Sequence, residues 1–191
     1  MTSAASVGGD ERLRLFLGLR LPGDVVSGLV EWQERELRPG LGATAARGGG
    51  RLVPAGNLHI TLAFLGSRPA AELPAILEAL GAACVRGERP ELEVRAYREG
   101  RSVGMLVLDD RELRATRLAE DVQTRVEQLG AYRREKRPWL PHVTVVRFRE
   151  RPRLAPALPE LGPVAPSDAA AFLSRLHPSG ARYEVLQSFS L

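Results

Sequence analysis

The sequence predicts an α+β fold with largely antiparallel sheets, and three observations lead to this prediction. The expected elements run strand, helix, strand, helix, two strands, helix and three strands, an order that separates strand runs from helix runs. A Glu99-Gly100 turn joins two of the strands directly. A strand that carries His-x-Thr occurs at residues 59–61 and again at 142–144, which indicates a loose internal duplication without a strict repeat.

The first half of the chain is predicted to hold two strands and two helices. Leucine at every second position indicates a half-buried first strand, and Pro22-Gly23-Asp24 ends it. Apolar residues at helical spacing follow, and then a loop that ends in three glycines and is expected at the rim of a site. The expected elements are a strand over 13–19, a helix over 25–37, the loop over 39–50, a strand over 58–65 and a helix over 70–85.

The second half is predicted to be richer in strands. A helix with apolar residues on one side ends at Gly130, a residue typical of the position after a helix C-terminus. A proline-rich stretch over 152–166 separates the last two strands from the rest. The expected elements are strands over 92–97 and 103–108, a helix over 111–129, and strands over 139–148, 170–176 and 183–191.

Composition and charge narrow the class of protein. Hydrophobic residues at 44% and charged residues at 26% are ordinary for a globular chain and exclude wholesale disorder. The formal net charge of +4 permits a nucleic-acid partner without requiring one. Only Lys136 among the 27 basic residues is a lysine. Arginine forks suit phosphate recognition, but a bias this uniform is more readily explained by the base composition of the source genome.

Cysteine content and hydropathy bear on the cellular compartment. The single cysteine, Cys84, excludes an intramolecular disulfide, and its apolar neighbours favour a packed side chain over a nucleophile. No run approaches the roughly 20 apolar residues of a membrane span. Residues 1–10 lack the apolar segment of a signal peptide. We therefore expect a disordered tail over 1–10, a single domain over 11–191, and a cytoplasmic monomer that contacts no membrane.

The first His-x-Thr element is Asn57-Leu-His-Ile-Thr-Leu-Ala-Phe-Leu-Gly66. Side chains alternate between the two faces of a strand, so His59 and Thr61 are predicted to project together. The opposite face is fully apolar and must pack on a core. That face is predicted to carry Leu58, Ile60, Leu62 and Phe64.

The second element, Pro141-His-Val-Thr-Val-Val146, repeats this local geometry with His142 and Thr144. If the two strands pair pseudo-symmetrically, two imidazoles and two hydroxyls converge on one point. This set suits a phosphodiester, because a neutral imidazole can accept a proton from water and a protonated one can donate to the leaving oxygen. Threonine hydroxyls can donate to the non-bridging phosphate oxygens. The chemistry requires no nucleophilic side chain, metal or other cofactor.

The third histidine does not share the pattern. His177 precedes Pro178 at the end of an expected strand, where an exposed loop histidine is the simplest interpretation. A zinc site is not supported, since the chain has no HExxH helix, no CxxC pair and no carboxylate ligand on either histidine element.

These residues resemble the RNA 2′,3′-cyclic phosphodiesterases of the two-histidine phosphoesterase superfamily, whose bacterial and archaeal members are also called 2′-5′ RNA ligases. The resemblance covers nearly the whole chain, and its two signatures occur in the family's order. It rests on Arg14-Leu-Phe-Leu-Gly-Leu-Arg-Leu-Pro22, on the segment from Asn57 to Gly66, on Pro141-His-Val-Thr-Val-Val-Arg147 and on the segment from Ser174 to Tyr183.

The resemblance implies a bilobal fold with a central cleft between two mainly antiparallel sheets and with helices on the outer faces. It implies metal-independent opening of a 2′,3′-cyclic phosphate at an RNA end to a 2′-phosphomonoester. Carried over, His59 would be the proton donor, His142 the proton acceptor, and Thr61 and Thr144 the phosphate-binding residues. The residues themselves do not favour this assignment over its reverse. By microscopic reversibility, the same site could join RNA ends through a 2′-5′ bond.

Two further residues match the family's pattern as candidate substrate contacts. Arg147 lies five positions beyond His142, so strict alternation places it on the opposite face. It reaches the cleft only if the strand ends or bulges near Val146. Phe16 is a candidate for stacking on a base, although an apolar phenylalanine in a strand is more often part of the core. Trp139, Arg134 and Arg137 are expected to border an RNA path or to form a solvated face.

Two alternatives remain open. One is a non-catalytic module of the same fold that binds a nucleotide or an RNA end. The other is an enzyme for a small substrate, such as a cyclic nucleotide or an ADP-ribose cyclic phosphate. Turnover of an oligonucleotide that ends in a cyclic phosphate separates the first from the hydrolase, and relative rates on short and long substrates decide the second.

Overall fold

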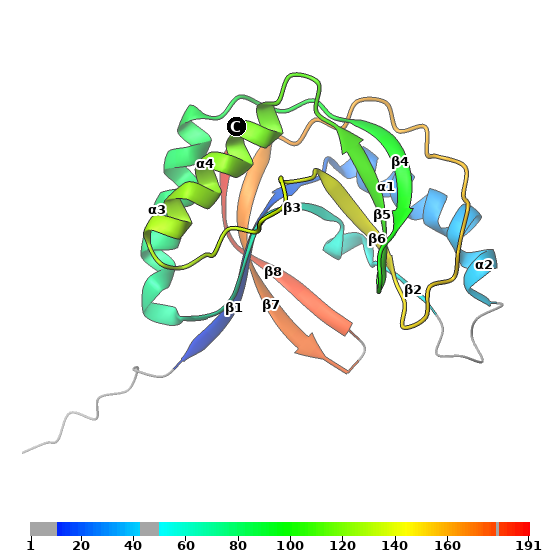
Figure 1. Ribbon diagram of the computed structural model, residues 1–191, viewed down its shortest axis with the longest axis horizontal. Helices are drawn as coiled ribbons and strands as arrows, with labels where there is room; N and C mark the ends of the chain where they lie inside the picture. Colours follow the sequence, from blue (N-terminus) through cyan, green and yellow to red (C-terminus); the bar gives the residue numbers. More distant parts are fainter. Residues whose placement is uncertain (1–10, 43–49, 179) are drawn as a thin grey trace, which may run out of the picture.

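The computed structural model describes residues 11–42, 50–178 and 180–191, and it confirms the α+β prediction. All strands of these ranges belong to one curled antiparallel sheet with the order β4-β5-β6-β3-β1-β7-β8, and β2 pairs with β6 at its side (Figure 1). The expected disordered tail over 1–10 lies outside the described residues.

One half of the sheet holds the first histidine element. Its strands are β1 (Arg12–Arg20), β3 (His59–Pro69), β7 (Asp168–His177) and β8 (Gly180–Ser190). β1 lies between β3 and β7, and β8 is paired with β7 along its whole length. His177, at the end of β7, is exposed, as expected from the sequence.

The other half holds the second histidine element. Its strands are β2 (Arg51–Leu52), β4 (Glu93–Glu99), β5 (Val103–Asp109) and β6 (His142–Arg147). The two halves meet where β3 runs beside β6, at the single pair Ile60–Val143. The two sheets that the resemblance implied are therefore joined into one, and the junction lies between the two histidine elements.

Helices cover the sheet from the outside of its curl (Figure 1). α1 (Gly23–Trp32), the π-helical turn Gln33–Leu37 and α2 (Arg38–Gly42) are continuous in the chain. The ring centroids of Trp32 and of Tyr97 in β4 are 6.4 Å apart, which places α1 over the second half of the sheet. α3 (Leu73–Arg86), which follows a short 3-10 turn over Ala70–Glu72, contacts β7 and β8, and α4 (Arg114–Gln128) contacts β3, so both cover the first half.

Some boundaries differ from the sequence predictions for identifiable reasons. The expected strand over 139–148 begins only at His142, since Pro138 and Pro141 lack the N–H that a strand ladder needs. The expected loop over 39–50 is helical as far as Gly42, and residues 43–49 lie outside the described residues. The two-residue strand β2 is too short to leave a periodic pattern.

The core lies between the helices and the sheet. Its side chains come from every helix and most strands, and they include Trp32, Leu17, Ile60, Leu80 and Val145. Cys84 is buried there, and burial raises the pKa of its thiol to about 11, in agreement with the interpretation as a packed side chain. No described helix has both the length and the apolar character to span a membrane.

Candidate active site

The two histidine elements lie side by side in the middle of the sheet. Ile60 of β3 pairs with Val143 of β6 in antiparallel register. Continuing that register by one residue in each direction sets His59 opposite Thr144 and Thr61 opposite His142. Directly opposed residues on neighbouring strands have Cβ atoms about 5 Å apart. The four groups that the sequence predicted to converge therefore lie on adjoining strands, with each histidine across from the other element's threonine.

Each element contains a β-bulge three residues after its histidine. Between β1 and β3, Leu17 pairs with Ala63 and Gly18 with Thr61, so Leu62 is an extra residue. Between β5 and β6, the pairs of Val146 and Thr144 leave Val145 as the extra residue. A bulge of this kind reverses the alternation of the side chains that follow it. As a result, residues 59–64 and 142–147 have the same burial pattern, with two consecutive buried residues at the bulge.

The bulges bring the fifth residue after each histidine back to the face of the site. Beyond Val145, this residue is Arg147, which is exposed and lies beside His59 and Thr144 in one cavity. The bulge that the sequence required near Val146 is thus present. Beyond Leu62, the equivalent residue is Phe64, which is 49% exposed. The prediction that Phe64 packs in the core was wrong, because it assumed unbroken alternation along the strand.

Phe64 is a candidate site residue that the sequence reasoning missed. Its ring accepts a cation–π contact from Arg14, whose Cζ lies 4.9 Å from the ring centroid. The signal that could have found it is its spacing, which from His59 equals that of Arg147 from His142.

Backbone carbonyls fix both imidazoles in the same tautomer. Nδ1 of His59 lies 2.7 Å from the carbonyl oxygen of Asn57, and Nδ1 of His142 lies 2.8 Å from that of Leu140. A carbonyl can only accept, so each Nδ1 carries the proton and each neutral ring has its lone pair on Nε2. In the neutral His59 ring, Nε2 accepts a hydrogen bond of 3.0 Å from the Thr61 hydroxyl.

The surroundings of the two histidines differ. His59 packs in an aromatic cluster, with ring centroids 4.7 Å from Phe16, 5.3 Å from Tyr183 and 5.8 Å from Phe172. A Cβ at Gly18 would lie 3.3 Å from Cδ2 of His59 and 2.8 Å from the carbonyl oxygen of Ile60, so glycine is needed beneath the ring.

Phe16 is 2% exposed, and its ring centroid lies 4.7 Å from that of His59 and 4.7 Å from that of Phe172. In this conformation a base cannot reach Phe16, so it supports His59 rather than offering the stacking face expected for the substrate.

This environment keeps His59 neutral. Burial is the largest cause that lowers the pKa of His59 from its ordinary value of 6.5 to about 4. The hydrogen bond to Asn57 raises the pKa, whereas the positive charges of His142 and Arg147 lower it further. Both groups are thus close enough to His59 to act on its charge. At neutral pH the free protein holds a neutral imidazole at position 59.

Two cavities flank the junction of β3 and β6. The smaller, of about 90 Å³, includes His59, Thr144 and Arg147 in its lining. The larger, of about 340 Å³, includes Thr61 and His142, and we call it the His142-side cavity. Its other lining residues are Leu62, Ala63, Phe64, Met105, Gln123, Tyr132, Glu135, Arg137, Pro138, Trp139 and Leu140.

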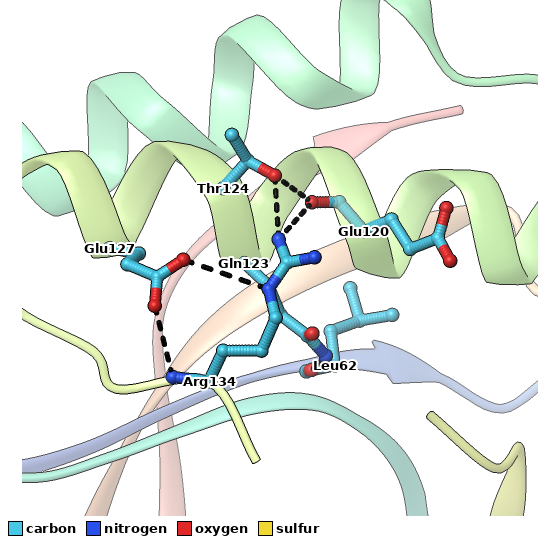
Figure 2. Close-up of polar contacts among 6 residues, drawn as sticks. All are labelled: Leu62, Glu120, Gln123, Thr124, Glu127 and Arg134. Carbon is cyan, nitrogen blue, oxygen red and sulfur yellow. Dashed lines mark hydrogen bonds and ion pairs between the residues drawn. The ribbon is translucent and has the colours of Figure 1, made fainter. Parts of the chain in front are cut away.

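The three other residues expected near an RNA path have different fates. Arg137 lines the His142-side cavity. Trp139 also lines it, and its Nε1–H donates to the carbonyl oxygen of Thr61 at 2.9 Å. Arg134 instead lies along α4, where it donates to the Thr124 hydroxyl at 2.7 Å and forms an ion pair with Glu127 (Figure 2). Arg134 is thus held by the helix, and it lines neither cavity.

A larger hollow, of about 680 Å³, lies elsewhere, where the segment that follows β6 crosses the end of β4. Its central carboxylate, Glu99, accepts hydrogen bonds from Tyr97, from Arg151 and from the backbone N–H groups of Arg153 and Leu154. These contacts tie the loop to the sheet. Within the described ranges, no group of three or more histidine, cysteine or acidic side chains is placed to hold a metal ion.

Comparisons with known proteins agree on one family. A family model described as the 2′-5′ RNA ligase superfamily matches residues 29–177, which include both histidine elements. An RNA 2′,3′-cyclic phosphodiesterase of Thermus thermophilus is 35% identical over 190 residues, covering 94% of this chain and 90% of the relative.

Solved structures share the fold. The Thermus thermophilus protein TT0787 superposes with a TM-score of 0.74 at 33% identity, over 94% of this chain and 98% of that one. E. coli LigT in its apo form has a TM-score of 0.73 at 24% identity, over 95% and 99% of the two chains, and shows the fold alone. The family model and the relative each span most of the sequence, and they confirm the resemblance carried by the two His-x-Thr elements. This chain belongs to the 2′-5′ RNA ligase superfamily.

Proposed function

We propose that this protein hydrolyses the 2′,3′-cyclic phosphate at RNA ends to a 2′-phosphomonoester, without a metal ion. The observation that carries the proposal is the pairing of Ile60 with Val143, which sets two imidazoles and two threonines on adjoining strands. The Thermus thermophilus relative bears the name of this activity, which supports the same reaction here.

The reaction can be written through the groups present. His142 accepts a proton from water through its Nε2 lone pair, and the water oxygen forms a bond to phosphorus. The bond from phosphorus to the 3′-oxygen breaks, and Nε2–H of protonated His59 donates its proton to that oxygen. Thr61 and Thr144 donate to the non-bridging oxygens, where negative charge grows. The family's pattern supplies the donor and acceptor roles.

The donor role sets a condition on His59. With a pKa of about 4, its imidazole is neutral in the free protein at neutral pH. A phosphate anion next to the ring raises that pKa, because a nearby opposite charge favours the protonated form. Protonation also turns Nε2 from an acceptor into a donor, so the Thr61 hydroxyl that now bonds to it becomes available to the phosphate. Substrate binding would therefore favour the protonated form of His59, which is the form that can act as the acid.

The first test is turnover of an oligonucleotide that ends in a 2′,3′-cyclic phosphate, with EDTA present. We expect a 2′-phosphomonoester, formed at the same rate with and without the chelator, as measured by ³¹P NMR and chromatography. Binding without turnover would support the non-catalytic module instead. A mononucleotide 2′,3′-cyclic phosphate turned over far faster than the oligonucleotide would favour the small-substrate alternative.

The same site could form or cleave a 2′-5′ bond. In ligation, a 5′-hydroxyl takes the place of water, gives its proton to His142 and bonds to phosphorus as the 3′-oxygen leaves. Water needs only about 30 Å³, whereas the cavity beside His142 measures about 340 Å³. That volume lies in the range of small-ligand pockets. The exposed ring of Phe64 and the indole of Trp139 offer surfaces for stacking a second nucleoside.

The two residues at equivalent spacing should then affect different substrates. Arg147→Ala should raise KM for a mononucleotide 2′,3′-cyclic phosphate about tenfold, through loss of a stacking or phosphate contact. Phe64→Ala should raise KM about tenfold for a 2′-5′-linked dinucleotide, and by a smaller factor for the mononucleotide. Steady-state kinetics on both substrates give the four values. If Phe64→Ala raised KM equally for both substrates, the second nucleoside would not bind in the His142-side cavity.

An RNA substrate also supports the expectation of a cytoplasmic protein. The expectation of a monomer is tested by measuring the molar mass by light scattering after size-exclusion chromatography.

A further inference from the structure

Two buried glutamines have equivalent places relative to the two histidine elements. Gln33 and Gln123 are 2% and 6% exposed, and they are two of the four polar or charged residues buried in the described ranges. Gln123 Nε2 donates to the carbonyl oxygen of Leu62 at 2.9 Å. Gln33 Nε2 donates to that of Val145 at 2.6 Å. Both acceptors are the extra residues of the two bulges.

The equivalence extends to the chain path. Gln33 follows α1, which comes after β1, yet it reaches the bulge of β6 in the other half of the sheet. Gln123 lies in α4, which comes after β5, and it reaches the bulge of β3. Each histidine strand is thus held by a helix that follows a strand of the opposite half. In Figure 2, Gln123 lies on the side of α4 next to Leu62.

The bulges determine which side chains face the site. An extra residue leaves the ladder locally disrupted, and its buried carbonyl needs another donor. Val145 obtains two, Gln33 Nε2 and the backbone N–H of Val53 at 2.9 Å. Gln33 also donates to the carbonyl oxygen of Val53 at 3.1 Å. If a bulge slid by one residue, the residue after it would change face and the threonine before it would tilt.

The helix is unusual at Gln33. A π-helical turn runs over Gln33–Leu37 between two α-helical segments, a form that is rare and frequent at functional sites. Gln33 is the first residue of that turn, so the wider turn begins where the side chain leaves the helix for the sheet.

From these contacts we infer that Gln33 and Gln123 are paired positioning residues. Each glutamine fixes one bulge, and thereby the orientation of one threonine and of the residue five positions beyond the histidine. Gln33 acts through Thr144 and Arg147, and Gln123 acts through Thr61 and Phe64. The inference rests on the proposed function, because its readout is the rate of phosphate opening.

The experiment replaces each glutamine by methionine, which keeps length and volume but removes the donor. Misplacing a catalytic group by about 1 Å can cost up to about 10²-fold in rate. We expect kcat to fall by about tenfold or more in Gln33→Met and in Gln123→Met. KM for the mononucleotide cyclic phosphate should rise by less than the roughly tenfold expected for Arg147→Ala, because the guanidinium is displaced in Gln33→Met but not removed.

The matched control is Trp32→Phe. Trp32 is 1% exposed, and its Nε1–H donates to the carbonyl oxygen of Ala157 at 2.7 Å, so this variant also loses a donor to a backbone carbonyl. It should lower the melting temperature and leave kcat as in the wild type. If the glutamine variants behave in the same way, the positioning role is refuted. If the wild type itself does not open the cyclic phosphate, the proposed function fails instead.

A measurement on the wild type answers the same question if the variants do not fold. Adenosine 2′-monophosphate is titrated into ¹⁵N-labelled protein. The side-chain NH₂ signal of Gln33, which lines neither cavity at the site, should shift, and the Trp32 indole signal should not. An unmoved Gln33 signal at saturation would refute the inference.

Discussion

Replacing either His59 or His142 by alanine is expected to lower kcat for opening of a 2′,3′-cyclic phosphate by at least about 10²-fold, the usual contribution of a general acid or base. The two losses should not add in the double variant, because the groups act on one transition state. His177→Ala is the matched control, since this histidine is exposed and lines neither cavity at the site. Full activity in either site variant would refute the two-histidine mechanism.

A sulfur substrate separates the roles of the two histidines. A 3′-thiolate leaves without protonation, so the acid becomes dispensable when sulfur replaces the 3′-bridging oxygen. On that substrate, His59→Ala should recover to within about tenfold of the wild-type rate, whereas His142→Ala should keep its full loss, about 10²-fold. The opposite pattern would reverse the donor and acceptor roles, while leaving the proposed hydrolysis intact.

The sequence predicted which side chains share a face of each histidine strand, because each pattern is local. Strand periodicity placed His59 with Thr61 and His142 with Thr144, and the structure sets these elements on adjoining strands. Helix and strand types were also correct for most elements, since amphipathic spacing reports burial directly.

Features that depend on a partner strand could not be read in this way. The bulges at Leu62 and Val145 arise from mismatched register with β1 and β5, which no local pattern records. The bulges explain why Phe64 is exposed and not in the core, and why Arg147 lies on the same face as His142. Gln33 contacts Val145, which lies 112 positions further along the chain. Nothing in the sequence around Gln33 therefore distinguishes it from an exposed polar residue of a helix.

The asymmetry between the histidines also arises from tertiary packing. Both elements read alike in the sequence and bond alike to the backbone, yet only His59 lies against Phe16, Phe172 and Tyr183. Phe172 and Tyr183 come from β7 and β8, more than a hundred residues further along the chain. The same cluster that orients the ring also desolvates it and thereby lowers its pKa.

That desolvation makes the stability of the protein depend on pH. The folded-state pKa of His59 is about 4, below its ordinary value of 6.5, so the unfolded chain binds the proton more tightly. The contribution of His59 to stability is therefore present in full above pH 6.5, falls as the pH drops below 6.5, and is lost in full below about 4. One pKa unit corresponds to about 1.4 kcal/mol, so the upper bound on this contribution is about 3.5 kcal/mol, and the partial exposure of the ring reduces it.

The free energy of unfolding, measured in urea between pH 7.5 and 3.5, isolates this contribution when wild type is compared with His59→Gln. The glutamine amide cannot gain a proton in this pH range, so the variant removes the titration of position 59. The wild type should lose up to about 3 kcal/mol more than this variant over the range. If the free energy of unfolding depended on pH in the same way for wild type and His59→Gln, burial would not lower the pKa of His59. Substrate binding would then not be needed to protonate it.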